Sequence, residues 1–250
     1  MPSDRPVRGL RLYLDTPLRE GLRLELPAEA AHHAGRVLRL REGEELRLFD
    51  GRGGEYPATI EAIVRARVTV SVGAQRDIER ESPLGITLVQ GISSGERMDL
   101  TIQKAVELGV KALQPVLSEK SIVRLDAERA QVKCAHWQRV AIAACEQCGR
   151  NRIPEVLPVR TLGEWCRTGG GAALRLLLSP RTQTRLREAL VLPAPEIVLA
   201  IGPEAGFSAD EEAMLHAAGY VAVRLGPRVL RTETAAPAVL AALNALAGDF

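Results

Sequence analysis

Two short stretches near the C-terminus constrain the fold more than any other part of this chain. Residues 199–208 (LAIGPEAGFS) and 225–234 (LGPRVLRTET) each follow an apolar run typical of a buried strand, and each leads into a helical pattern. Glycine at Gly202, Gly206 and Gly226 lets the backbone approach a ligand closely. Open α/β sheets bind ligands outside the carboxyl ends of their strands. The two stretches therefore predict a ligand crevice at one edge of such a sheet.

The C-terminal part of the chain alternates apolar strand-like runs with helical patterns. This alternation predicts a parallel sheet that is covered by helices on both faces. A capping-box pattern at residues 208–211 (SADE) indicates that a helix starts directly after the first glycine loop. We expect strands at 86–90, 112–117, 174–178, 197–201 and 221–225, and helices at about 96–108, 127–147, 162–167, 182–190, 209–217 and 234–246.

The N-terminal part has a different pattern, because its apolar and polar residues alternate in short runs. Period-two alternation is typical of strands with one buried face, and Asp50-Gly51 between two runs is a hairpin signal. These patterns predict a small antiparallel β-barrel over residues 1–74, a polar linker over 75–84 and an α/β domain over 85–250. We expect the barrel strands at 10–14, 22–26, 45–49, 55–63 and 67–72, and one short helix at 27–36.

Composition excludes some classes of protein. With 46% hydrophobic and 26% charged residues the chain is ordinary for a globular protein, and a net charge of +2 does not by itself indicate nucleic-acid binding. No apolar run approaches ~18 residues, so we expect no membrane span and a cytoplasmic protein. Cys145 and Cys148 have the spacing of redox and zinc motifs, but they fall on the apolar stripe of a predicted helix. We expect buried thiols there and no metal.

The two glycine loops also resemble the paired cofactor loops of a known family. Together with residues 32–43 (HHAGRVLRLREG), 99–109 (DLTIQKAVELG) and 146–150 (EQCGR), they are similar to the RsmE family of 16S ribosomal RNA uracil-N3 methyltransferases, which belong to the SPOUT, or trefoil-knot, class. The resemblance runs in order through nearly the whole chain. One departure is Ala205, where the family usually has glycine; its methyl group fits if the φ angle there is negative.

The resemblance implies a fold, a cofactor and a substrate. It implies a PUA-like N-terminal barrel that binds RNA, a SPOUT domain with a C-terminal trefoil knot, and a homodimer. S-adenosylmethionine would be the methyl donor, and its adenine would lie among main-chain groups of the two loops. The substrate would be a uridine of 16S rRNA, free or in the assembled small subunit. The candidate cofactor-binding residues are Leu199, Gly202, Pro203, Glu204, Gly206, Leu225, Gly226 and Leu230.

Methylation of uracil N3 requires loss of a proton, because N3 is a weak nucleophile while it carries one. A nearby base or a cation that stabilises the developing charge would help. We name Arg231 as the candidate for charge stabilisation, and Glu204 or Glu233 as the candidate proton acceptor. The alternative for Arg231 and Glu233 is an ion pair on the surface or in a dimer interface.

Candidate RNA contacts come from both parts of the chain. Arg36, Arg39 and Arg41 form a basic cluster that, with the family resemblance, indicates phosphate contact. Gln147 and Arg150 belong to a segment that the resemblance places near the active centre, although an arginine at a helix end also suits the helix dipole. Two other functions stay open: methylation of tRNA ribose or of a different base, and a non-catalytic role in ribosome assembly.

Overall fold

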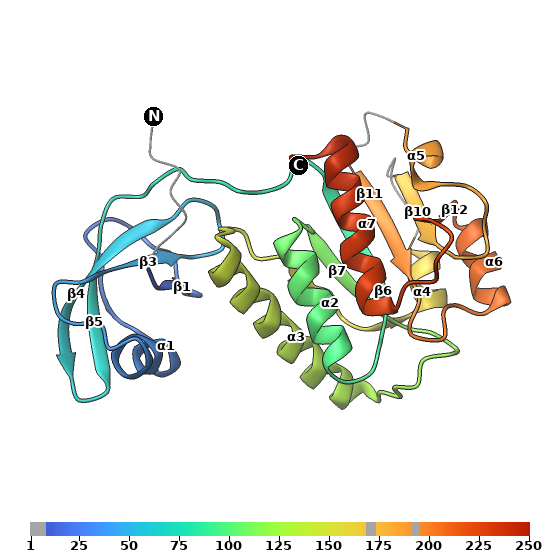
Figure 1. Ribbon diagram of the computed structural model, residues 1–250. Coiled ribbons are helices and arrows are strands. Elements are labelled where there is room, and N and C mark those ends of the chain that lie inside the picture. Colours follow the sequence, from blue (N-terminus) through green and yellow to red (C-terminus); the bar gives the residue numbers. More distant parts are fainter. Residues whose placement is uncertain (1–8, 169–173, 192–195) are drawn as a thin grey trace. The chain divides into compact units, whose positions relative to one another are not determined.

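The computed structural model describes residues 9–168, 174–191 and 196–250, which form two units (Figure 1). The first unit contains Met1–Glu81 and Cys145–Ile153, and the second contains Ser82–Ala144 and Pro154–Phe250. Residues 145–153 therefore belong with the N-terminal unit, not with the 85–250 domain that the sequence predicted.

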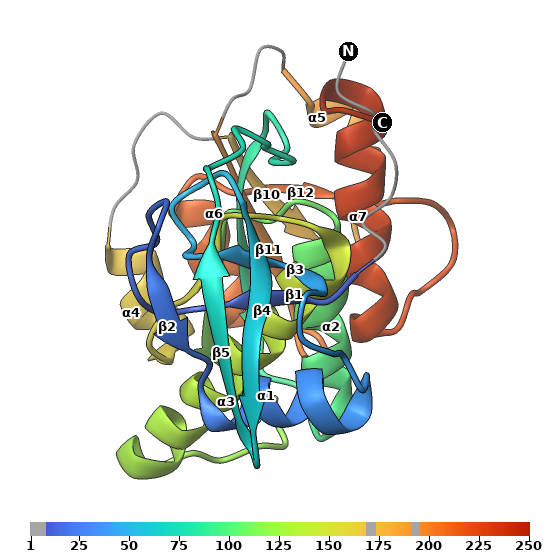
Figure 2. The same ribbon diagram turned by 90° about the vertical axis from the view of Figure 1, so that its left-hand side faces the viewer.

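The first unit is built on a five-stranded sheet (Figure 2). Its order is β1 (Arg11–Tyr13), β3 (Glu45–Phe49), β4 (Tyr56–Val64), β5 (Arg67–Val72) and β2 (Arg23–Glu25). The pairs β3–β4, β4–β5 and β5–β2 are antiparallel, as predicted, but β1 runs parallel to β3. Alternation in a sequence determines which face a side chain occupies and not the direction of the neighbouring strand, so this pair could not be predicted. The alternating residues bury one apolar core, which includes Leu46, Leu48, Ile60, Val68 and Val70.

The connections in this sheet differ in detail from those predicted. The helix expected at 27–36 consists of α1 (Ala28–His32) followed by a π-helical turn, η1 (His33–Val37). Gly51 has the positive φ of +79° that favours glycine in turns. The β3–β4 connection nevertheless spans residues 50–55 and is not a two-residue hairpin turn.

The segment predicted as a linker packs against the first unit. Arg76 forms an isolated antiparallel bridge with Glu55, with backbone N–O distances of 2.8 and 3.0 Å. Arg150 pairs with Glu81, and buried Arg11 donates to the Arg150 carbonyl at 3.1 Å. These contacts explain why the boundary between the units lies at Glu81 and why the end of the long helix joins the first unit.

The second unit contains a parallel sheet in the order β12 (Val221–Val223), β10 (Leu174–Leu178), β11 (Glu196–Ile201), β6 (Gly85–Gly91), β7 (Ala112–Leu117) and β8 (Glu155–Val156). The parallel pairing confirms the prediction. The short strands β8 and β9 (Arg160–Thr161) were not predicted, and β9 also pairs with β7. The helices are α2 (Glu96–Glu107), α3 (Ala127–Cys148, which continues into the first unit), α4 (Leu162–Arg167), α5 (Leu186–Ala189), α6 (Ala209–Ala217) and α7 (Thr232–Ala247).

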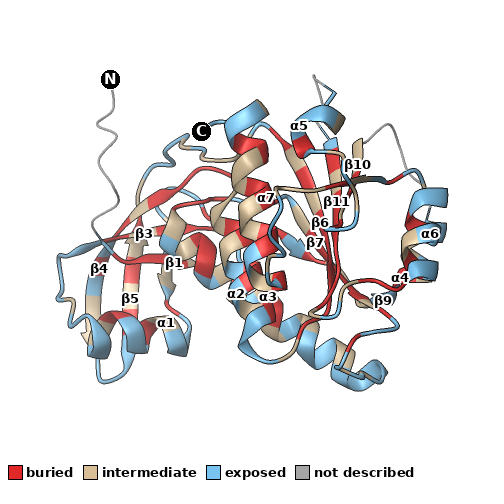
Figure 3. Ribbon diagram, turned by 45° about the vertical axis from the view of Figure 1, so that its right-hand side comes forward, coloured by how far each residue is buried: buried red, intermediate tan, exposed pale blue. Residues whose placement is uncertain are grey.

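Helices cover both faces of the parallel sheet. On one face Val89, Leu177 and Ala200 form a core with Leu162 of α4 and Leu215 of α6. Helices α2 and α7 lie against each other across the other face (Figure 1), and the central strands are buried along most of their length (Figure 3). Because all strands run in one direction, the loops that follow β6, β10, β11 and β12 meet at one edge. This edge carries the candidate site.

The helices and Cys145 of α3 have the character expected of a protein without membrane spans or reactive thiols in the described residues. None of the helices in the described ranges is both long and apolar enough to cross a membrane. Cys145 is buried within α3, as predicted, whereas Cys148 at the end of α3 is only partly buried. Burial raises the pKa of Cys145 to about 12, so its thiol stays protonated at neutral pH. This environment suits a small buried apolar side chain rather than a reactive thiolate.

Candidate active site

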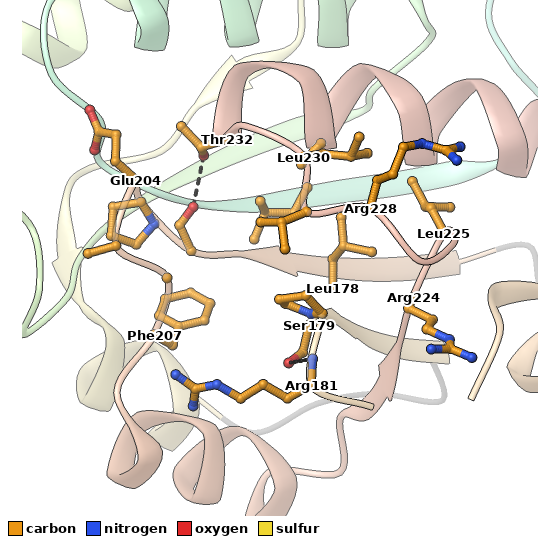
Figure 4. Close-up of a pocket in the computed structure, with 18 of the residues that line it drawn as sticks. Leu178, Ser179, Arg181, Glu204, Phe207, Arg224, Leu225, Arg228, Leu230 and Thr232 are labelled. Carbon is orange, nitrogen blue, oxygen red and sulfur yellow. Dashed lines mark hydrogen bonds between the residues drawn. The ribbon is translucent and has the colours of Figure 1, made fainter. Parts of the chain in front are cut away.

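A cavity opens between the loops that follow β10, β11 and β12 (Figure 4). Its volume of about 210 Å³ is several times the ~30 Å³ that a water molecule occupies in the liquid, so it is ligand-sized and not a packing defect. Apolar side chains and main-chain groups form most of its wall. The lining residues are Leu178, Ser179, Pro180, Arg181, Ile201, Gly202, Pro203, Glu204, Ala205, Gly206, Phe207, Glu212, Arg224, Leu225, Gly226, Arg228, Val229, Leu230, Thr232 and Ala235.

The first glycine loop is folded so tightly that no side chain fits at Gly202, nor at Gly91, which lies against the loop. A Cβ atom on Gly202 would lie 2.8 Å from the Gly206 Cα, and one on Gly91 would lie 2.5 Å from the Pro203 nitrogen. The loop can therefore adopt this path only with glycine at both places. Ala205 is not among the residues with positive φ, so its methyl group is accommodated, as the sequence required.

The second glycine loop presents open backbone to the cavity. A Cβ atom on Gly226 would meet nothing within 4 Å, so that space is available to a ligand. The start of α7 is tied to the first loop, because the Thr232 hydroxyl donates to the Gly202 carbonyl at 2.8 Å (Figure 4). The amide of fully buried Gln90, at the end of β6, donates to Thr232 Oγ1 at 3.0 Å. These bonds hold the two loops in one arrangement.

Glu204 is directed away from the centre of the cavity (Figure 4) and is held by the loop that follows β6. Its Oε1 atom accepts from the Ser94 N–H at 2.9 Å, from the Ser94 hydroxyl at 2.8 Å and from Arg97 Nη1 at 3.0 Å. Burial opposes ionisation of this carboxyl, but the hydrogen bonds outweigh it and lower the pKa of Glu204 to about 2. Such a weak base is a poor proton acceptor at neutral pH. These bonds anchor Glu204 to the loop after β6, and its predicted role as a proton acceptor stays a prediction.

Arg97 also faces the second carboxylate singled out from the sequence. Its Nε atom lies 3.8 Å from Glu233 Oε1, so one guanidinium joins Glu204 and Glu233. Arg231 precedes Thr232 as the N-cap residue of α7 and is exposed, and the described residues offer its side chain no ion pair. The cation paired with Glu233 is therefore Arg97 from α2, and the alternative of an Arg231–Glu233 pair is not formed within the chain.

Comparison with known proteins decides the family. A family model described as an RNA methyltransferase domain matches residues 80–244, and one described as an RNA methyltransferase PUA domain matches residues 26–72. Ribosomal RNA small subunit methyltransferase E from Buchnera aphidicola is 33% identical over 96% of this chain and 94% of that protein. The chain belongs to the ribosomal RNA small subunit methyltransferase E family.

Two solved structures show the same fold at higher identity. A ribosomal RNA small subunit methyltransferase E from Neisseria gonorrhoeae, bound to S-adenosyl methionine, is 42% identical to this chain, with a TM-score of 0.90. The match covers 97% of this chain and 100% of the Neisseria chain. A methyltransferase from Legionella pneumophila, in complex with the cofactor SAM, is also 42% identical, covers 98% of this chain and 100% of that chain, and has a TM-score of 0.92.

In this chain, the cavity brings together most of the predicted cofactor residues. Gly202, Pro203, Glu204, Gly206, Leu225, Gly226 and Leu230 all line it, and only Leu199 does not, because it is fully buried inside the sheet. Sequence reasoning missed Gln90, Ser94 and Arg97. A usable signal existed, since residues 93–97 follow a predicted strand and so had to reach the same edge as the glycine loops.

The mouth of the cavity is cationic. Figure 4 shows Arg181, Arg224 and Arg228 around it. Arg181 Nη1 lies 3.6 Å from Glu212 Oε2. Arg228 lies in the second glycine loop, whereas Arg181 and Arg224 follow strands β10 and β12 outside any sequence motif. Arginines here can meet the carboxylate or phosphate groups of a bound ligand.

The RNA candidates fall into two groups. Arg36, Arg39, Arg41 and Gln147 are exposed, so contact with RNA stays a prediction for each of them. Arg150 is different, because only 4% of the residue is exposed and its guanidinium is paired with Glu81. The predicted role of Arg150 in RNA contact is therefore replaced by a structural one within the first unit.

Proposed function

We propose that this chain transfers a methyl group from S-adenosylmethionine to N3 of a uridine in the 16S rRNA of the small ribosomal subunit. The observation that carries the proposal is the cavity between the two glycine loops, whose walls offer main-chain groups and apolar side chains. Such a surface suits a neutral, flat nucleoside such as the adenosine of the cofactor, as in the related S-adenosyl methionine complexes.

The fit rests on three features of the loops. Gly226 leaves open space beside the second loop, and Gly206, with a φ of +68°, likewise has nothing within 4 Å of a built Cβ. Leu225 and Leu230 supply apolar contact for an adenine ring. The bonds among Gln90, Thr232 and the Gly202 carbonyl fix the loops before a ligand arrives, which lowers the entropic cost of binding.

Bound S-adenosylmethionine supplies an electrophilic methyl group whose sulfonium charge is lost on transfer, so the protein has mainly to orient it. The protein's harder task concerns uracil, whose N3 proton must leave as the N–C bond forms. We assign the stabilisation of negative charge on the uracil carbonyl oxygens to Arg231, whose side chain is exposed at the start of α7. Glu233 is the candidate proton acceptor, because Glu204 is held as an ionised anchor.

The assembly belongs to the same proposal. We place the enzyme in the cytoplasm as a homodimer, with the C-terminal region knotted as its family resemblance implies. In support of a second copy, α7 and the second glycine loop border a hollow whose apolar residues include Leu225, Pro227, Ala242, Ala245 and Leu246, with Arg185, Arg187 and Arg224 also in its lining. Leu246 is 48% exposed and Val229 is 79% exposed, which favours burial against a partner.

Transfer of a radioactive methyl group tests the proposal. Purified chain and labelled S-adenosylmethionine are incubated separately with small-subunit rRNA, large-subunit rRNA, 30S particles, 50S particles and tRNA. We expect incorporation into the small-subunit substrates alone. Incorporation only into large-subunit RNA or tRNA would redirect the proposal to another substrate, and no incorporation together with no calorimetric binding of the cofactor would overturn it.

A further inference from the structure

One end of the small sheet carries an unusual backbone feature. Among the described residues, the only two residues other than glycine with positive φ are Arg39, at +55°, and Arg65, at +60°. This conformation is uncommon for residues with a Cβ atom and is concentrated at sites where function requires it. Arg39 follows η1, and Arg65 lies in the turn between β4 and β5. Both side chains are exposed.

These two arginines come from neighbouring segments. The Ile63 N–H donates to Glu42 Oε1 at 2.9 Å, and the Gly43 N–H donates to the Ile60 carbonyl at 2.8 Å. The segment after η1 is thereby fastened to the β4 strand just before its turn. Figure 2 shows α1 and the β4–β5 hairpin at the same end of the sheet. The two segments form one continuous surface.

The charges on this surface are not neutralised by ion pairs. Glu42 and Glu44, the nearby carboxylates, accept from the backbone N–H groups of Ile63 and Arg41. Elsewhere in the unit arginines do pair, as Arg23 does with Glu61. The exposed arginines of this end, none of which forms an ion pair or a side-chain hydrogen bond with another described residue, are Arg36, Arg39, Arg41, Arg65 and Arg67. We call these five residues the arginine surface.

Apolar side chains are exposed among these cations. Val37 is 57% exposed, Leu38 is 46% exposed and Val64 is 56% exposed. Exposed apolar groups between unpaired arginines suit a partner that offers both phosphates and flat apolar faces. Single-stranded or irregular RNA has both, because its bases are unstacked and can contact apolar or guanidinium planes. A regular duplex hides its bases and would leave the apolar groups without a contact.

We infer that η1, the segment after it and the β4–β5 hairpin form one binding surface for unpaired RNA. The five arginines hold consecutive phosphates, and Val37, Leu38 and Val64 contact the faces of exposed bases. Arg65 and Arg67 on the hairpin extend the predicted cluster of Arg36, Arg39 and Arg41 onto a second segment of the chain. The inference rests on the proposed function, since it specifies the kind of RNA structure that the substrate must present.

Titration of RNA affinity against salt tests the cation part of the inference. The probe is an unpaired 16S rRNA segment transcribed in vitro, beside a duplex of equal length. Arg65→Gly removes one cation and also relieves the positive φ, so its thermal stability should be equal to or above that of the wild type. The log–log salt slope should fall by roughly 0.7, the value per phosphate contact on a single strand. Adding Arg67→Ala should double that change and weaken binding about tenfold near 0.15 M salt.

Arg19→Ala is the matched control. Arg19 is exposed and lies shortly before β2, whose first residue pairs with the end of β5 that is far from the β4–β5 turn. The Arg19→Ala substitution therefore removes the same charge from the opposite end of the sheet. Its salt slope should equal that of the wild type. Equal slopes for Arg65→Gly and Arg19→Ala would overturn the inference, as would equally tight wild-type binding to the duplex.

Leu38→Ser tests the apolar part separately. We expect affinity for the unpaired RNA to fall severalfold while the salt slope stays unchanged, because no phosphate contact is lost. Unchanged affinity would remove base contact from the inference. Failure of the proposed function looks different: the wild type itself would transfer no methyl group to small-subunit rRNA, whatever the arginine surface binds.

Discussion

Arg97 Nη1 lies 3.0 Å from Glu204 Oε1, and the same guanidinium has its Nε 3.8 Å from Glu233 Oε1. One side chain of α2 thus connects the first glycine loop with the beginning of α7. Both connected elements border the cavity, so Arg97 ties the first loop to the helix that follows the second loop. None of the three residues needs to touch the cofactor for this link to matter.

Replacement of Arg97 by alanine should loosen the first loop. A hydrogen bond to a charged group contributes about 1.5–3 kcal/mol, and half-exposure of Arg97 places this one at the low end. We expect kcat/KM for S-adenosylmethionine to fall by roughly tenfold, which is about 1.4 kcal/mol, with RNA affinity unchanged. Arg139→Ala is the control, because Arg139 of α3 is exposed and forms no ion pair with another described residue. An Arg97→Ala enzyme as active as that control would show that the link does not position the loop.

The ionisation of Glu204 should not govern activity near neutral pH. Its pKa is lowered from 4.5 to about 2, so the folded state favours the charged form. This favourable contribution to stability is complete above the unfolded pKa and is lost as the pH falls from about 4.5 towards 2. Glu204→Gln should therefore be less stable than the wild type at pH 7, and the difference in Tm should shrink below pH 4.

The pH–rate profiles of the wild type and of Glu204→Gln test the role of Glu204 independently. Between pH 5 and 9, Glu204→Gln should change the height of the profile and leave its midpoints in place. If the substitution removed a midpoint near neutrality, Glu204 would be a proton acceptor after all, and the anchoring role would be wrong.

Gly226→Val should fill the open space beside the second loop. A Cβ atom there meets nothing within 4 Å, so the domain should fold, while the added side chain occupies the room expected for adenosine. We expect calorimetry to show at least a hundredfold loss of cofactor affinity, about 2.8 kcal/mol. Gly219→Val, at a glycine of positive φ that also has no neighbour within 4 Å, controls for backbone strain. Cofactor affinity equal in the two variants would place the adenosine elsewhere.

Arg231→Lys separates charge stabilisation from a structural role. Lysine keeps a point charge but lacks the planar fork that can address a carbonyl oxygen. The single-turnover methylation rate should fall by an amount equivalent to about 2–4 kcal/mol, by analogy with loss of one oxyanion-hole donor, while RNA and cofactor affinities hold. If Arg231 serves only a dimer contact, sedimentation should instead show monomer. A near-normal rate in an intact dimer would exclude a catalytic role.

Local patterns predicted most of the strands and helices around the site, but the helix expected at 182–190 is only α5 (Leu186–Ala189) and the strand expected at 221–225 ends at Val223. The capping box at Ser208 and Glu211 forms, and α6 occupies the predicted residues. Prediction was weaker where long-range packing decides. Strand direction at the β1–β3 pair and the membership of residues 145–153 in the first unit depend on partners far away in the sequence.

In the candidate site, too, features set by local sequence could be predicted and features set by long-range packing could not. Gly202 and Gly226 could be predicted because a glycine requirement is visible in a single loop. The partner of Glu233 could not, since Arg97 lies 136 positions away and the nearer Arg231 has the same charge. Likewise, the burial of Arg150 against Glu81 could not be predicted, because Glu81 lies far from Arg150 in the sequence.

Identification of the methylated nucleoside tests the central claim most directly. Small-subunit rRNA from cells lacking this activity is incubated with the purified chain and S-adenosylmethionine, digested to nucleosides and analysed by mass spectrometry against authentic standards. The account predicts one new 3-methyluridine per rRNA molecule, absent with the Gly226→Val variant. Methylation at a ribose 2′-hydroxyl, at another base or at another atom of uracil would contradict it.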